Sequence, residues 1–206
     1  MFDLGENPKR VLCAWLWDEL SPRGYSSLYD AFSGSGSVGH FFKKKNYQAL
    51  CSDILQSHYW LEKALIENND GTLSQPEMAL ITDESNLANA SPYFQDWGDH
   101  YFTIEETAYL GLWWDNINQA SQLSENQKAL AYSAVYLTIA YWLAFNKTYL
   151  KSKPQSPREA LTHYLHHLNN QVYQNQLPNA VYCINAYHIA TDLPAHIAWI
   201  YPPGLM

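Results

Sequence analysis

Three closely spaced glycines and an acidic residue have the clearest chemistry in this sequence. Gly34, Gly36 and Gly39 come directly after a short apolar run at residues 27–32. Glycine tolerates positive φ and lets a ligand approach the backbone closely, and the helix after such a turn offers its first N–H groups to polar or anionic atoms. Asp53 follows a second apolar run, where an acid accepts hydrogen bonds from the two hydroxyl groups of a ribose. The spacing therefore indicates a site for an adenosine-containing cofactor.

The glycine spacing alone leaves more than one ligand open. The pattern G-x-G-x-x-G is formally met by Gly34, Gly36 and Gly39, and it is also typical of nicotinamide and flavin dinucleotide sites. A tight strand-to-helix turn that binds no ligand is a further alternative. The residues by themselves do not choose among these three.

The elements that must position these residues alternate between strands and helices. Helical spacing of apolar residues predicts helices over 8–20, 40–45 and 56–68. Short apolar runs predict strands at 27–32, 47–52 and 77–82. Strand, glycine turn, helix and strand in this order are typical of a parallel sheet covered by helices. We therefore expect an α/β fold.

The sequence pattern in the middle of the chain differs from that of the first part and predicts helices. Thr103 is a plausible N-cap with Glu106 three residues on, which forms a capping box. Helices are predicted over 103–120, 127–145 and 156–173, and strands return at 180–184 and 197–201. The expected organisation is an α/β domain made of residues 1–90 and 179–206, with a helical insertion at 91–178.

Charge and composition limit the classes of partner. The 206 residues carry 12 Lys and Arg against 20 Asp and Glu, a net charge of −8. Such a field opposes nucleic-acid binding, which depends on basic side chains. A local basic stretch nevertheless makes DNA a possible partner; its residues are Lys147, Lys151, Lys153 and Arg158. The three cysteines have no metal-ligand spacing, and no signal peptide or membrane span is evident, so we expect a cytoplasmic protein and no membrane or metal site.

The segment from Ser27 to Asn69 resembles the cofactor-binding half of Dam-like adenine-specific DNA methyltransferases. Those enzymes show an aspartate, then Phe-Ala/Ser-Gly-Ser/Gly-Gly, and an Asp after the second strand. Residues 101–108 are similar to a segment of the family's target-recognition part. The resemblance implies a Rossmann-like methyltransferase fold, S-adenosylmethionine as cofactor, adenine in DNA as substrate and a role in restriction–modification. Implied cofactor-binding residues are Lys9, Asp30, Phe32, Ser33, Gly34, Ser35, Gly36, Asp53 and Ile54.

The catalytic motif of that family is altered in this chain. The family has D-P-P-Y after a later strand: the Asp accepts hydrogen bonds from the adenine amine, and the Tyr stacks on a base flipped out of the duplex. The corresponding stretch here is Tyr201, Pro202, Pro203 and Gly204. Losing one oriented polar group commonly costs about 100- to 1000-fold in rate. The sequence ends two residues later, so we expect the last strands of the fold to be missing. A degraded enzyme and a non-catalytic cofactor- or DNA-binding relative both fit this pattern.

Weaker constellations favour ordinary structural roles. His163, His166 and His167 share one helical face, but no Cys or carboxylate accompanies them, so a solvated polar face is the better interpretation. Aromatic residues at 113–114 and 132–142 could stack on nucleobases. Aromatics on amphipathic helices more often form a core, and that is what we expect here.

Overall fold

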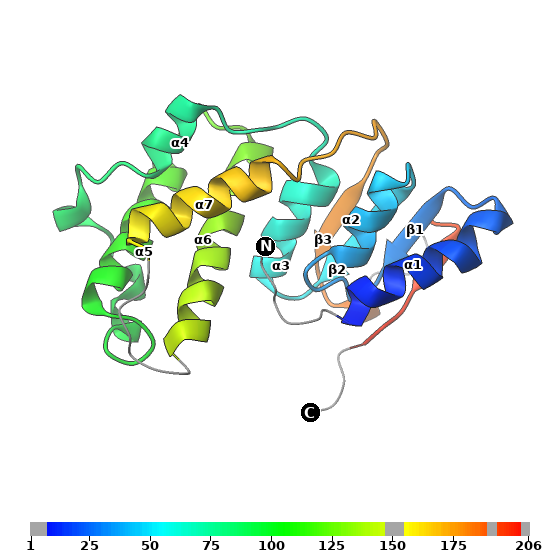
Figure 1. Ribbon diagram of the computed structural model, residues 1–206, viewed down its shortest axis with the longest axis horizontal. Coiled ribbons are helices and arrows are strands. Elements are labelled where there is room, and N and C mark those ends of the chain that lie inside the picture. Colours follow the sequence, from blue (N-terminus) through cyan, green and yellow to red (C-terminus); the bar gives the residue numbers. More distant parts are fainter. Residues whose placement is uncertain (1–7, 147–154, 189–192, 203–206) are drawn as a thin grey trace. The chain divides into compact units, whose positions relative to one another are not determined.

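The computed structural model describes residues 8–146, 155–188 and 193–202, which form two compact units. The first unit contains residues up to Asp70 and from Val172 onward, and the second covers Gly71–Gln171. The helical unit is thus inserted into the chain of the α/β unit (Figure 1). Each unit has a core of its own.

The α/β unit is built on a four-stranded parallel sheet. Its strands are β1 (Ser27–Asp30), β2 (Gln48–Asp53), β3 (Ala180–Cys183) and β4 (Ile197–Trp199), in the order β3-β2-β1-β4. Leu28 aligns with Ala49 on one side and with Ile197 on the other. The carboxyl ends of all four strands therefore lie at the same edge of the sheet. This is the mixed α/β, Rossmann-like arrangement expected from the sequence.

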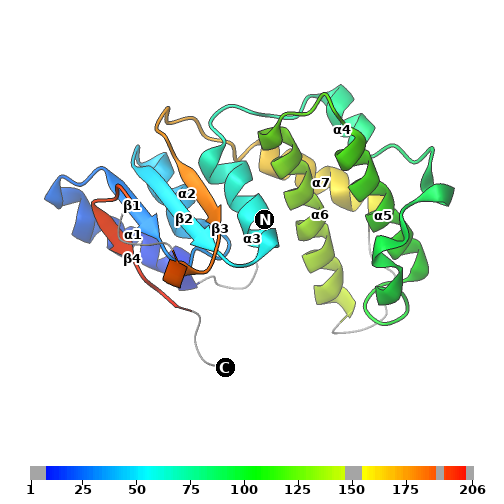
Figure 2. The same ribbon diagram turned by 180° about the vertical axis from the view of Figure 1, so that it is seen from behind.

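Helices α1 (Pro8–Leu20), α2 (Ser37–Lys44) and α3 (Gln56–Glu62) cover one face of this sheet, as the two opposite views show (Figure 2). A π-helical turn, η2 (Lys63–Glu67), continues α3. The core on this face includes Cys13, Leu16, Leu28, Val38, Phe42, Ala49, Cys51 and Ile66. A separate cluster around Tyr29, Ala31 and Leu50 packs on the other face. Alternation of side chains along β1 and β2 produces these two faces.

A buried lysine stabilises the end of the π-helical turn. Lys43 of α2 is completely buried, and its Nζ donates to the carbonyls of Leu65 (3.2 Å) and Asn68. Burial lowers the pKa of Lys43 to about 8. These carbonyls have lost their helical partners at the end of η2, and the ammonium replaces those partners.

The helical unit contains α4 (Gln75–Ile81), α5 (Ile104–Gln119), α6 (Glu125–Asn146) and α7 (Pro157–Asn169). Capping boxes start three of them: Ser74 with Glu77, Thr103 with Glu106, and Ser156 with Glu159. The core is rich in large residues; among them are Leu110, Trp113, Ile117, Leu130, Val135, Trp142, Leu161 and Leu165. The α5 box and the three long helices confirm the sequence prediction for this region.

The predicted third strand at 77–82 is wrong, because this segment is helix α4. Glu77 accepts hydrogen bonds from the Ser74 backbone N–H (2.7 Å) and hydroxyl (2.6 Å), and Pro76 occupies the first turn. This capping chemistry favours a helix over the strand that the apolar run suggested. The third strand is β3, which follows the helical unit. Residues 71–90 accordingly belong to the helical unit and not to the α/β unit, where the sequence had assigned them.

Among the described helices, none is both long enough and apolar enough to cross a bilayer.

Candidate functional site

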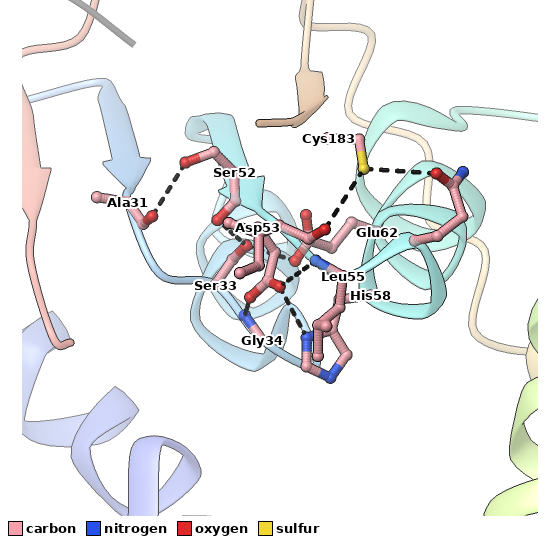
Figure 3. A network of polar contacts seen from close by, with 11 residues as sticks. Ala31, Ser33, Gly34, Ser52, Asp53, Leu55, His58, Glu62 and Cys183 are labelled. Carbon is pink, nitrogen blue, oxygen red and sulfur yellow. Dashed lines mark hydrogen bonds and ion pairs between the residues drawn. The ribbon is translucent and has the colours of Figure 1, made fainter. Parts of the chain in front are cut away.

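Asp53, at the carboxyl end of β2, lies against the glycine turn (Figure 3). Its Oδ2 accepts a hydrogen bond from the Gly34 N–H at 3.0 Å. Its Oδ1 accepts one from the Leu55 N–H at 2.9 Å and lies 3.1 Å from Nδ1 of His58. Two backbone N–H donors, from the turn and the following loop, and the imidazole of His58 on helix α3 thus converge on one carboxylate. The structure brings the predicted acid and the predicted turn together.

The surroundings of Asp53 keep it ionised. Burial alone would raise its pKa, but the hydrogen bonds from His58, Leu55 and Gly34 and the positive charge available on His58 outweigh burial, and the pKa falls below its usual value. The side chain remains 15% exposed. A partly accessible carboxylate that is charged at neutral pH is a strong acceptor for hydroxyl groups.

The glycine turn uses its amides inside the protein, which corrects the expectation that they face a ligand. Gly34 (φ 60°) donates to Asp53, and Gly36 (φ 70°) donates to the Ser33 carbonyl at 3.1 Å. A Cβ at Gly36 would lie 3.0 Å from Ile66 Cδ1, and one at Gly39 would lie 2.4 Å from Cys51 Sγ. Gly36 and Gly39 are therefore required because α3 with η2 and strand β2 approach the turn so closely.

A buried polar network stabilises the glycine turn on the side that faces the protein interior. Ser33 is buried, and both its N–H (3.1 Å) and its hydroxyl (2.8 Å) lie within hydrogen-bonding distance of the Ser52 carbonyl. The same hydroxyl also contacts the buried carboxylate of Glu62 on α3. Ser52 Oγ in turn donates to the Ala31 carbonyl at 3.0 Å. Ser33 was predicted to line the cofactor; its hydroxyl points into the protein toward Glu62, so any part of it in cofactor binding stays a prediction.

The other predicted site residues differ in accessibility. Asp30 is fully buried at the end of β1, whereas Phe32 and Ser35 are half-buried. Ile54 and Leu55 are large apolar residues that are nonetheless 65% and 50% exposed beside Asp53. A carboxylate next to an exposed apolar pair could hold a ligand that joins neighbouring hydroxyl groups to a flat apolar ring. This set of groups fits the adenosine part of the expected cofactor.

Lys9 belongs to α1, but its side chain is outside the described part of the structure, so its role stays a prediction.

Sequence reasoning missed His58, Glu62 and Cys183. The signal for His58 was available, because side chains in the first turn of a helix lean back toward the helix N-terminus and α3 begins three residues after Asp53. Cys183 pairs with Asp53 in the register of β2 and β3, and its Sγ lies 3.9 Å from the Ile54 carbonyl oxygen and 3.5 Å from Gln56 Oε1. Only the register, which sequence does not give, brings this thiol to the site.

Residues 201–204, which the sequence predicts to be an altered catalytic motif, follow β4, on the opposite side of β1 from Asp53. The Ala31 N–H donates to the Trp199 carbonyl at 3.0 Å, which ties the end of β1 to β4. Tyr201 is 40% exposed, and its ring stacks on Trp199 with an interplanar angle of 3°. Pro202 is exposed, while Pro203 and Gly204 lie outside the described residues. The carboxyl edge of the sheet thus carries an aspartate after β2 and a tyrosine after β4.

The predicted DNA-contacting stretch is described only in part. Arg158 is exposed in the first turn of α7, whereas Lys147, Lys151 and Lys153 lie outside the described residues. Between Lys63 and Lys128 the sequence contains no Lys or Arg. All Lys and Arg side chains of the helical unit therefore lie from Lys128 onward.

The aromatic residues of the helical unit that were predicted to form a core do so in part. Trp113, Tyr132 and Trp142 are buried, whereas Trp114, Tyr136 and Tyr141 are half-buried. Exposed aromatics instead include Tyr93 and Tyr101, which precede α5. In the described ranges, no cluster of three or more His, Cys, Asp and Glu side chains has the arrangement of a metal site.

Comparison with known proteins adds to this geometry. The family described as D12 class N6 adenine-specific DNA methyltransferase matches residues 8–193, a range that ends before β4. Over 102 residues the chain is 31% identical to the Type II methyltransferase M2.HphI of Haemophilus parahaemolyticus, covering 50% of this chain and 30% of that protein. The aligned part is thus less than a third of the relative's length. No solved structure matches the chain significantly.

Proposed function

The chain belongs to the D12 class N6 adenine-specific DNA methyltransferase family, and from that membership we propose that it binds S-adenosylmethionine at the carboxyl ends of β1 and β2 but transfers the methyl group poorly or not at all. The observation that carries this proposal is the placement of Asp53. Its ionised carboxylate lies beside the glycine turn and next to an exposed apolar pair.

In this proposal each residue has a specific task. Asp53 accepts hydrogen bonds from the sugar hydroxyls, and the exposed side chain of Ile54 packs on the adenine ring. Gly36 keeps the turn compact by letting Glu62 and Ile66 approach, so that the turn keeps its shape before a ligand arrives. S-adenosylmethionine, when bound, supplies an electrophilic methyl group. The contribution of the protein is to hold that group in a fixed position.

Impaired transfer follows from the residues after β4. Adenine is a weak nucleophile, and a carboxylate that accepts hydrogen bonds from its amine orients the nitrogen lone pair. Tyr201 offers a hydroxyl in place of that carboxylate and lacks its charge. Gly204 has no ring to stack on a base that has left the duplex. The proposal therefore predicts a protein that binds the cofactor but transfers its methyl group inefficiently.

DNA is the partner that family membership favours, and we propose that contacts run through Arg158 and the lysines at 147, 151 and 153. Because the net charge is −8, such binding would be weak. Since it would depend on contacts between basic side chains and phosphates, it would weaken further as salt is added.

Protection of Cys183 tests the cofactor proposal directly. Cys183 is exposed beside Ile54, whereas Cys13 and Cys51 are buried, so maleimide should label Cys183 in the folded protein. Burial and the nearby carboxylates of Asp53 and Glu62 raise the pKa of Cys183, so labelling should be slow and a change in its rate easy to follow. We expect S-adenosylhomocysteine at millimolar concentration to slow the labelling of Cys183, measured by peptide mass spectrometry.

The matched control is Asp53→Ala, in which Cys183 remains but the sugar acceptor is lost. Protection should disappear in that variant. Equal labelling rates with and without S-adenosylhomocysteine in the unmodified protein would overturn the cofactor proposal.

A further inference from the structure

The His58 imidazole lies against one oxygen of Asp53, the carboxylate that the proposed function assigns to the ribose. Its Nδ1 lies 3.1 Å from Asp53 Oδ1, and its side chain is 34% exposed (Figure 3). The other two donors that contact Asp53 in the described chain are the backbone N–H groups of Gly34 and Leu55. Those amides are fixed by the chain path. His58 is the donor that can leave by rotation of a side chain.

The number of acceptor positions on Asp53 makes this contact significant. A carboxylate offers about four lone-pair positions. The Leu55 N–H takes one position of Oδ1 and the Gly34 N–H takes one of Oδ2. The His58 imidazole lies against Oδ1, with its Nδ1 at 3.1 Å, where a sugar hydroxyl would approach this oxygen. The imidazole must therefore move before two ribose hydroxyls can bind to the two oxygens.

From this geometry we infer that His58 competes with the cofactor sugar for Asp53 and so sets both the affinity for the cofactor and the pH dependence of binding. The inference rests on the proposed function, since it takes Asp53 to be the sugar acceptor. His58 rotates away when the sugar binds. The favourable free energy of its interaction with Asp53 is then lost, and the affinity for the cofactor is lower by that amount.

Charge makes the competition depend on pH. A protonated imidazole forms an ion pair with Asp53, whereas a neutral one offers at most an uncharged hydrogen bond, and a charge-assisted bond is about twice as strong. The other titratable groups on the surrounding elements are Asp30 at the end of β1, Glu62 on α3 and the Cys183 thiol on β3. All of these are neutral or anionic. Protonated His58 is thus the cationic competitor at this edge, and acidification strengthens it.

The test is a titration with S-adenosylhomocysteine at about pH 8 and about pH 5.5. Affinity of the unmodified protein should fall on acidification by roughly three- to fivefold, the range for a partly exposed ion pair. His58→Ala should bind more tightly than the unmodified protein at the lower pH, by a similar factor, and should lose the pH dependence.

His58→Asn is the matched control, because its side-chain amide keeps a neutral donor near the place of Nδ1 but cannot be protonated. It should bind equally at both pH values, like the unmodified protein at high pH. If His58→Ala binds as the unmodified protein does at the lower pH, or more weakly, His58 is not a competitor and the inference is wrong.

Failure of the proposed function gives a different result, namely no binding by any of the three proteins at either pH. The inference about the sugar would fall with it. A double-mutant cycle of Asp53→Asn and His58→Ala on urea unfolding at about pH 5.5, where imidazole is mostly protonated, reports on the pair without ligand. A coupling free energy between the two substitutions that is present at about pH 5.5 and smaller at about pH 8 shows that the pair depends on charge. The absence of coupling at both pH values contradicts the contact between His58 and Asp53 itself.

Discussion

The carboxyl ends of β2 and β4 flank the same central strand and differ in what they retain. After β2, Asp53 is contacted by two backbone N–H donors and by the His58 imidazole, and it lies beside exposed apolar side chains. After β4, Tyr201 is 40% exposed and its ring stacks on Trp199, while the Trp199 carbonyl accepts a hydrogen bond from the Ala31 N–H of the neighbouring strand end. The two ends therefore differ in the group that they present, a carboxylate after β2 and a phenol hydroxyl after β4. Our proposal places cofactor binding at the first end and impaired methyl transfer at the second.

The largest expected effect concerns the β4 end. A tritium-methyl transfer assay on adenine-containing DNA should give a rate at least about 100- to 1000-fold below that of a family member with an intact D-P-P-Y motif, since an oriented polar group is lost. Tyr201→Asp alone should not restore turnover, because Gly204 still lacks the stacking ring. Tyr201→Phe serves as the control and should not change the rate. Measurable turnover of Tyr201→Asp would mean that the two ends differ less than proposed.

The next effect tests whether packing fixes the β2 end. Gly36→Ala places a Cβ 3.0 Å from Ile66 and 3.1 Å from Glu62 at a φ of +70°. We expect a loss of about 1–3 kcal/mol in the free energy of unfolding, from backbone strain together with overpacking. Gly24→Ala is the matched control, because Gly24 has φ +72° but nothing within 4 Å of the added Cβ. It should cost only about 1 kcal/mol, from the strain alone. Equal losses in urea unfolding would show that packing against α3 and η2 does not set the turn.

The smallest effect concerns the charge of Asp53. Its pKa in the folded protein lies below the ordinary aspartate pKa of about 3.9, so its ionised form contributes stability that is fully present above that value and is lost as the pH falls through the folded pKa. Asp53→Asn lacks this contribution. The difference in unfolding free energy between the two proteins should therefore shrink as the pH is lowered from about 5 to about 2. A difference that stays constant over this range would mean that the carboxylate gains nothing from its three donors.

Local patterns predicted most of the fold. Helical spacing and capping boxes are properties of neighbouring residues, and they located α1, α5, α6 and α7 within a few positions. The prediction for 77–82 was wrong because six residues with mixed apolar character do not distinguish a short helix from a strand. The capping box of Ser74 with Glu77 was present in the sequence but was not used. Read alongside Pro76, it would have indicated the helix.

The residues of the candidate site could be proposed from the sequence, but the hydrogen bonds among them could not. Asp53 and the turn follow from motif spacing. The internal use of the Gly34 and Gly36 amides does not, because it depends on how closely α3 and η2 approach the turn. Cys183 reaches the site only through the register of β2 with β3, which are separated by the whole helical unit.

The central claim is that Asp53 holds the sugar of an S-adenosyl cofactor, and calorimetric titration with S-adenosylhomocysteine tests it most directly. The unmodified protein should bind, and Asp53→Ala should bind at least about 100-fold more weakly, since two hydrogen bonds to a charged group are lost. Asp18→Ala, which removes an exposed acid of α1, should bind as the unmodified protein does. Binding that survives Asp53→Ala unchanged, or no heat from the unmodified protein, would contradict the claim.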